Sequence, residues 1–178
     1  MSEHILSCCF TGYRPQKFPF PLDITNEKYI DFENRLTAKI AELIKCGCLT
    51  FYTGMAMGFD IIAAECVLTL AKAMDNYAIR LICAIPFTEQ AKSFPDDWKA
   101  RYNNILRDAD QTVLISDGYY RNCYSKRNRF MVENSDFVLT WFDGSKGGTK
   151  NTIEYAKSIQ RKVINLYTEC YNDRGYNK

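Results

Sequence analysis

The chain has 178 residues, of which 47% are hydrophobic and 25% are charged, and its formal net charge is +2 at pH 7. This composition predicts a soluble globular protein with a packed core, and the near-neutral charge argues against a protein that grips the nucleic-acid backbone over a broad face. The longest apolar runs fall far short of the roughly 20 residues of a membrane span, and the N-terminus lacks a signal-peptide pattern, so we expect a cytoplasmic protein.

Short apolar runs rich in β-branched and aromatic residues alternate with longer amphipathic segments, a pattern typical of a parallel sheet covered by helices. The predicted strands are 5–10, 49–52, 79–85, 112–115, 137–141 and 163–167. The predicted helices are 27–45, with Asn26 as its N-cap, 58–73, 96–109, 122–134 and 149–161. The predicted fold class is α/β: a single Rossmann-like, doubly wound, mostly parallel sheet with helices on both faces.

The domain organisation is simple, because no repeat, low-complexity tract or linker interrupts the chain. We expect one domain over residues 1–168, followed by a polar tail, 169–178, that frays.

Cysteine and histidine usage excludes several kinds of site. The eight cysteines show no C-x-x-C spacing and most lie in apolar runs, which favours reduced, buried thiols. The single histidine, His4, lies at the N-terminus, where a chain is usually mobile. A His-dependent triad, a His-rich metal site and a His general base are therefore not expected, and no metal or cofactor is predicted.

Three predicted strands run directly into glycine-containing turns: "FTGYR", "YTGMAMG" and "WFDGSKGGT". Parallel strands joined by right-handed crossovers end at the same edge of a sheet, so these turns should converge there. Glycines allow close approach of the backbone, and the helices that follow point their free N–H groups at the same place. We therefore predict a phosphate site made of Thr11, Gly12, Thr53, Gly54, Gly58, Gly147, Gly148 and Thr149.

Two arginines are candidate partners for the phosphate. At about 100° per residue, Arg127 falls within the apolar stripe of the helix 122–134. A buried guanidinium needs a partner, either a ligand phosphate or ribose or, alternatively, a structural carboxylate. Arg14, on the first loop, is a second candidate or else a solvated surface residue.

Carboxylates near the predicted site are Asp60, Asp143 and Glu154. Asp60 lies in the first turn of its helix, where it either caps the helix or binds ribose hydroxyls. Glu154, one turn into the last predicted helix, faces either the ligand or solvent.

Five motifs, "TGYRP", "TGMAMGFDIIAAE", "IPFTEQ", "RNRFMVENSD" and "GSKGGTKNTIEYA", occur in this order over residues 8–166. Together they resemble the SLOG superfamily, the Rossmann-like group that unites the DNA-processing protein DprA with the LOG phosphoribohydrolases, and are most similar to its small bacterial YpsA-like proteins. The resemblance implies a doubly wound sheet that binds a nucleotide or nucleotide-derived molecule.

The LOG branch implies cleavage of the base from a nucleoside monophosphate by an Arg of an M-H-x-R-K motif and a Glu of P-G-G-x-G-T-x-x-E. "YSKRN" places Arg127 on the motif's Arg and Asn128 on its Lys. Glu154 is one residue out of register with the second motif, and one residue on a helix is a rotation of about 100°. Arg127 and Glu154 are the predicted catalytic residues of this alternative.

The DprA branch implies binding of single-stranded DNA, which uses a basic groove with aromatic stacking platforms. Tyr119 and Tyr120, beside Arg121, form such a platform or pack against the core. The small net charge argues against DNA. We therefore expect a sensor or regulator that binds a nucleotide-type small molecule, with the hydrolase and the DNA-binding protein as alternatives; pairing into a homodimer stays open.

Overall fold

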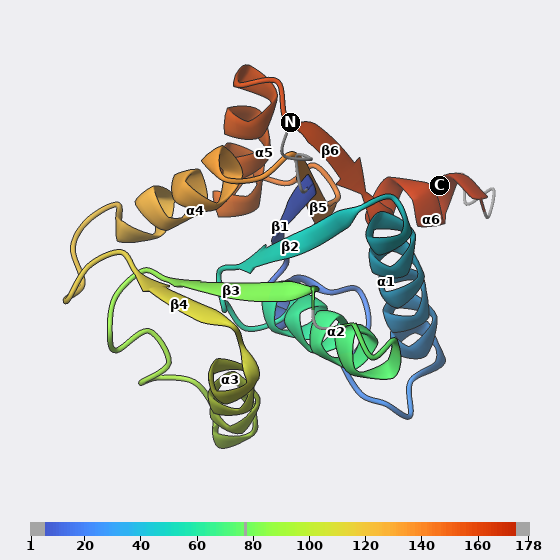
Figure 1. Cartoon of the computed structure of the whole chain (residues 1–178), viewed down its shortest axis with the longest axis horizontal. Helices are drawn as coiled ribbons and strands as arrows, with labels where there is room; N and C mark the ends of the chain where they lie inside the picture. The colour runs from blue at the N-terminus through green and yellow to red at the C-terminus, as the bar shows by residue number, and fades with distance from the viewer. Residues whose placement is uncertain (1–5, 77, 174–178) are drawn as a thin grey trace.

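The computed structural model describes residues 6–76 and 78–173, and these form a six-stranded sheet with helices packed against it (Figure 1). The spatial order is β4-β3-β2-β1-β5-β6, and every neighbouring pair is parallel. The predicted Rossmann-like fold class is confirmed. The strands are β1 (Leu6–Gly12), β2 (Cys48–Thr53), β3 (Arg80–Ile85), β4 (Gln111–Leu114), β5 (Phe137–Trp141) and β6 (Lys162–Asn165).

The chain reverses its direction of winding beside the central strand β1. It first adds β2, β3 and β4 on one side of β1 and then crosses to add β5 and β6 on the other. In register, Cys8 lies opposite Phe137 and Gly12 opposite Trp141. The carboxyl ends of β1 and β5 therefore flank the topological switch point, where open α/β sheets form a ligand crevice.

Helices cover both faces of the sheet. The helices are α1 (Glu27–Lys45), α2 (Phe59–Ala73), α3 (Asp96–Asp108), α4 (Cys123–Glu133), α5 (Gly148–Ser158) and α6 (Leu166–Asp173), and a short 3-10 turn, η1, spans Pro15–Lys17. Helices α1, α2 and α3 pack on one face, and α4 and α5 pack on the other. In the described part of the chain, none of these helices is sufficiently long and apolar to span a bilayer.

Strand alternation divides the core between these faces. Cys8, Phe10 and Leu139 belong to the larger core cluster, with residues of α1, α2 and α3. Cys9 and Val138, which point the other way, pack with residues of α4 and α5. Of the seven cysteines whose side chains the structure describes, six are buried, as predicted, and Cys46 is exposed. His4 lies outside the described residues.

Helix α1 occupies the predicted range, and the predicted cap is confirmed, because the Asn26 side chain accepts hydrogen bonds from the N–H groups of Lys28 and Tyr29. Its six buried residues recur at helical spacing, which places one apolar face against the core.

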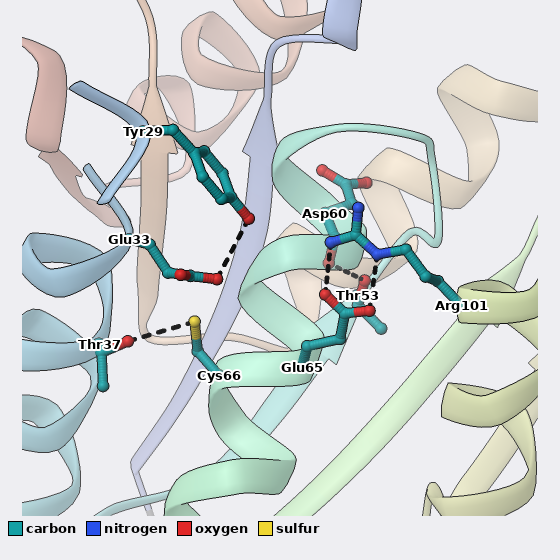
Figure 2. A network of polar contacts seen from close by, with 8 residues as sticks. All are labelled: Tyr29, Glu33, Thr37, Thr53, Asp60, Glu65, Cys66 and Arg101. Carbon is teal, nitrogen blue, oxygen red and sulfur yellow. Dashed lines mark hydrogen bonds and ion pairs between the residues drawn. The ribbon is translucent and has the colours of Figure 1, made fainter. Parts of the chain in front are cut away.

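Helix α2 packs between α1 and α3, and polar contacts hold it on both of these sides (Figure 2). The Thr37 hydroxyl of α1 donates to Cys66 at 3.4 Å. From α3, Arg101 holds the Glu65 carboxylate with both Nε and Nη2, at 2.8 and 2.5 Å. Bonds from two neighbouring helices therefore set the position of α2, whose first turn forms part of the candidate site.

The C-terminal region differs from the prediction. Strand β6 ends at Asn165 and helix α6 follows at once, whereas the sequence predicts a strand to residue 167 and a tail from 169. Asn165 explains the change: its Oδ1 accepts from the N–H groups of Tyr167 and Phe142, and its Nδ2 donates to the Phe142 carbonyl at 2.7 Å. This side chain turns the backbone out of the strand and caps the helix; residues 174–178 of the predicted tail lie outside the described part.

Candidate functional site

A cavity of about 330 Å³ opens at the switch point, between the loop after β1, the first turn of α2, helix α4 and the start of α5. Three loops that the sequence predicts to converge thus meet at one edge of the sheet. Eight of the predicted site residues line this cavity: Thr11, Gly12, Arg14, Asp60, Arg127, Asn128, Gly148 and Thr149.

Arg127 is buried at the cavity wall, as its helical position predicts, with 4% of its surface exposed. Its Nη1 donates to the Gly54 carbonyl, and its Nε donates to the side-chain oxygen of Asn128 at 2.7 Å. Burial lowers the pKa of this guanidinium, the charge of Asp60 raises it and the charge of Arg14 lowers it further. Arginine still remains protonated in proteins, so Arg127 brings a fixed positive charge to the cavity.

Asp60 is the buried carboxylate of the site. Burial raises its pKa to about 6, against the opposing effect of the Arg127 charge and of backbone hydrogen bonds from Ala56 and Gly54. The amides of the turn after β2 therefore already hold an internal carboxylate. An anionic ligand at this turn would have to compete with Asp60.

Three predicted site residues of that turn do not line the cavity, and each has an internal role. The Thr53 hydroxyl donates to the Asp60 carbonyl at 3.0 Å (Figure 2). The same hydroxyl accepts from the Met55 N–H. Gly54 lies against Arg127 and Asp60, and a Cβ there would stand 2.2 Å from Arg127 Nη1. Gly58 has a φ of 93°, and a Cβ on it would meet the Tyr13 carbonyl at 2.3 Å.

Arg14 adds a second guanidinium to the cavity. Its Cζ lies 6.0 Å from the centroid of the Tyr124 ring, and that of Arg127 lies 5.9 Å from the same centroid. Arg14 is exposed and, within residues 6–76 and 78–173, forms no salt bridge. Two like charges beside one ring repel each other, and an anion between them would relieve that repulsion.

The loop between β5 and α5 forms the opposite wall. The Thr149 hydroxyl donates to the Gly12 carbonyl at 3.1 Å, which ties the start of α5 to the end of β1. Gly147 has a φ of 149° and does not line the cavity; the nearest atom to a Cβ built on it is Lys17 Nζ, at 3.4 Å. Lys17 itself lines the cavity. This wall therefore combines a lysine with the unpaired N–H groups of a helix N-terminus.

Glu154 lies apart from this arrangement. Its side chain is 62% exposed, it pairs with Lys150 at 3.7 Å, and it is not among the residues that line the cavity. If Thr149 is matched to the threonine of the LOG motif, the glutamate position falls on Thr152, which is buried and whose hydroxyl donates to the Gly148 carbonyl at 2.8 Å. If Thr152 is matched instead, that position falls on Tyr155, one residue after Glu154. Asp143, the third predicted carboxylate, is bonded to the Tyr13 hydroxyl, and this bond lowers the pKa of Asp143.

The structure adds residues to the candidate site that the sequence does not predict. Gln90, in the loop after β3, is buried, and its Nε2 donates to the carbonyls of Gly54 and Met55 at 3.0 and 3.1 Å. Gln90 therefore supports the turn after β2, whose Gly54 carbonyl accepts the hydrogen bond from Arg127. The only signal in the sequence is its place in the motif "IPFTEQ". Lys17 and Tyr124 carry no comparable signal, because their role depends on how the loops fold.

Metal binding finds no support within the described residues, where no group of three or more His, Cys, Asp or Glu residues could hold an ion. Apart from the Asp60 carboxylate, the polar side chains that line the cavity are guanidinium, ammonium, amide and hydroxyl groups, which suit an anionic oxygen ligand.

Comparisons with known proteins agree with the motifs. A model described as the YspA SLOG family (YpsA) matches residues 8–169. "Uncharacterized SPbeta prophage-derived protein YoqJ" of Bacillus subtilis (strain 168) is 34% identical, over 74% of this chain and 84% of that protein. A "UPF0398 protein" of Bacillus thuringiensis (strain Al Hakam) is 28% identical, over 89% and 85%.

Two solved structures share the fold. DNA processing protein A from Helicobacter pylori, whose structure is described by its single-stranded DNA binding mode, has a TM-score of 0.60 at 19% identity, with 98% of this chain and 74% of that one aligned. DprA from Streptococcus pneumoniae has a TM-score of 0.61 at 16% identity, over 89% of this chain and about half (49%) of that one. At these identities the likeness concerns architecture.

Proposed function

Because the chain belongs to the YspA SLOG family, as its five motifs predict, we propose that it binds a phosphorylated nucleotide-type small molecule at the carboxyl edge of the sheet and acts as a sensor or regulator. The observation that carries this proposal is the pair of guanidinium groups, Arg14 and Arg127, at the cavity beside the switch point.

The charges of the cavity favour an anion. Arg14, Lys17 and Arg127 bring three positive charges to its lining, and Asp60 is the one carboxylate among the described lining residues. A phosphate group would find bidentate partners in the arginines and N–H donors at the start of α5. A cavity of about 330 Å³ lies at the lower end of the ~300–1,000 Å³ common for small-molecule sites, which suits a small phosphorylated ligand or the phosphate-bearing part of a nucleotide.

Binding without catalysis is supported by the position of Glu154. Glycoside hydrolysis needs a carboxyl group beside the scissile bond, and Glu154 is exposed and paired with Lys150. Under the phosphoribohydrolase alternative, Arg127 and Glu154 would release free base and ribose phosphate from a nucleoside monophosphate, and Glu154→Ala would abolish this release.

A thermal-shift screen tests the binding proposal. Nucleoside monophosphates, NAD, ADP-ribose and cyclic dinucleotides are added to the protein, and a ligand at 100 times its Kd is expected to stabilise the fold by about 2.7 kcal/mol. Arg14→Ala should remove most of this shift. Arg121→Ala is the matched control, because Arg121 is an exposed arginine that does not line the cavity. Absence of a shift with every ligand, or equal shifts in both variants, would overturn the proposal.

Binding of single-stranded DNA is a second candidate, supported by the single-stranded DNA binding of one structural neighbour, DNA processing protein A from Helicobacter pylori. Tyr119 also supports it, because its ring packs edge-on against Phe87 at 5.5 Å yet the residue is 70% exposed. An exposed aromatic ring beside Arg121 suits base stacking. Anisotropy of a labelled oligonucleotide at 50 and 200 mM salt is the test: affinity that falls steeply with salt supports this candidate, whereas no binding at the lower concentration rejects it.

A further inference from the structure

A second cavity, of about 530 Å³, lies between the N-terminal halves of α4 and α5 and shares Tyr124, Asn128 and Gly148 with the cavity described above. We call the first the phosphate lobe and the second the amide lobe. These three shared residues place the two lobes side by side.

The chemistry of the amide lobe differs from that of the phosphate lobe. Its lining holds three asparagines, a serine and a threonine, and Arg129 is the one charged residue among the described lining residues. Arg129 lies over the Tyr155 ring, with its Cζ 4.8 Å from the centroid. The lobe therefore offers neutral donors and acceptors and little positive charge for a second phosphate.

Two of the asparagine amides are available for a ligand. Asn128 is engaged, because its Oδ1 accepts from Arg127 and its Nδ2 donates to Thr152 at 2.8 Å. Asn122 makes no side-chain capping bond with α4, and Asn151 is exposed on the first turn of α5. A primary amide donates and accepts at once, which matches the mixed donor and acceptor edge of a nucleobase.

We propose that the amide lobe binds the nucleobase of a mononucleotide whose phosphate lies in the phosphate lobe; this inference rests on the proposed function. Tyr124 stands between the lobes, and its half-buried ring is held edge-on by Phe87 at 5.7 Å. Asn122 and Asn151 then supply the polar contacts that distinguish a nucleotide from a sugar phosphate.

Isothermal titration of the full chain with AMP, GMP, CMP, UMP and ribose 5-phosphate tests this. The variants are Asn151→Ala, which favours the helix because alanine has the higher propensity, and Asn122→Gly, which keeps the left-handed φ of 76° that this position requires. Asn103→Ala, at an exposed asparagine on α3, is the control.

The expected result is an affinity for the best nucleotide that falls about tenfold in each lobe variant, as for a lost specific polar contact, with affinity for ribose 5-phosphate unchanged and Asn103→Ala like the wild type. Nucleotide affinity within twofold of wild type in both variants overturns the base subsite while the proposed function stands. No binding of any nucleotide or of ribose 5-phosphate by the wild type overturns both.

Discussion

Gly54 leaves the space that the two buried charged side chains of the site, Arg127 and Asp60, occupy. Without a side chain, it lets the Arg127 guanidinium reach the Gly54 carbonyl and leaves room beside the same Cα for the Asp60 carboxylate. Arg127 lines the cavity, and the charge of the internal carboxylate Asp60 raises its pKa; a ligand phosphate at Arg127 stays a prediction.

Gly54→Ala is expected to destabilise the protein by about 1–3 kcal/mol, as overpacking does. The new Cβ would stand 2.2 Å from Arg127 Nη1 and 2.8 Å from Asp60 Oδ2, so the charged pair must move. Urea denaturation measures the change. Gly118→Ala is the control, because a Cβ there meets no atom within 4 Å; equal midpoints for the two variants would contradict this packing.

Asp60→Asn should remove a pH dependence of stability. Burial raises the pKa of Asp60 from 3.8 to about 6, so the folded protein holds this proton more tightly than the unfolded chain. The resulting stability is fully present below pH 3.8 and is lost as the pH rises through about 6, a change of about 3 kcal/mol. Denaturation from pH 4 to 7 should show wild-type stability falling relative to Asp60→Asn; parallel curves would show that the carboxyl is not perturbed.

At the scale of elements, the loop after β3 supports the turn after β2 through one buried amide. Gln90 donates to two carbonyls of that turn, whose residue Met55 has a left-handed φ of 56°. A non-glycine residue in this region carries strain, and the hydrogen bonds from Gln90 help hold it there.

Gln90→Glu is expected to destabilise the fold by about 2 kcal/mol or more, because it replaces a buried donor with an acceptor that faces two carbonyl oxygens. The reverse exchange at the next position, Glu89→Gln, is the control. Glu89 is exposed and forms an ion pair with exposed Lys92. Losing this surface ion pair should change the free energy of unfolding by no more than about 0.5 kcal/mol. Thermal denaturation compares the two variants. Similar melting temperatures would contradict the proposed support of the turn after β2 by Gln90.

Helix α1 offers a test of local capping. Asn26→Ala should cost about 1 kcal/mol, whereas Asn26→Gly should cost only a few tenths, because glycine is itself tolerated at an N-cap. Equal losses in chemical denaturation would mean that the Asn26 side-chain bonds to Lys28 and Tyr29 contribute little.

Local periodicity explains which elements the sequence predicts well. The apolar stripe of α1, the burial of Arg127 and the five strands before β6 follow from spacing alone. Helix α6 could not be predicted from spacing, because Asn165 ends β6 through hydrogen bonds to Phe142, a residue distant in the sequence.

At the scale of the whole molecule, the site exists because the chain winds outward from β1 in both directions. This topology brings Arg14, Arg127 and the start of α5 to one cavity, and the convergence of the three turns could be predicted from it. The roles of Asp60, Lys17 and Gln90 could not be predicted from the sequence, since they depend on how the loops pack against one another in the fold. The one-residue offset of Glu154 from the LOG motif, visible in the sequence, corresponds to a side chain that points away from the cavity.

The central claim is that a phosphate binds between Arg14 and Arg127 at the switch point. A crystal structure with the nucleotide that gives the largest thermal shift tests it most directly. The account predicts phosphate oxygens within hydrogen-bonding distance of both guanidinium groups and of the N–H groups at the start of α5. A nucleotide bound elsewhere, for example in the groove beside Lys72 and Asp75 at the C-terminal end of α2, would contradict it.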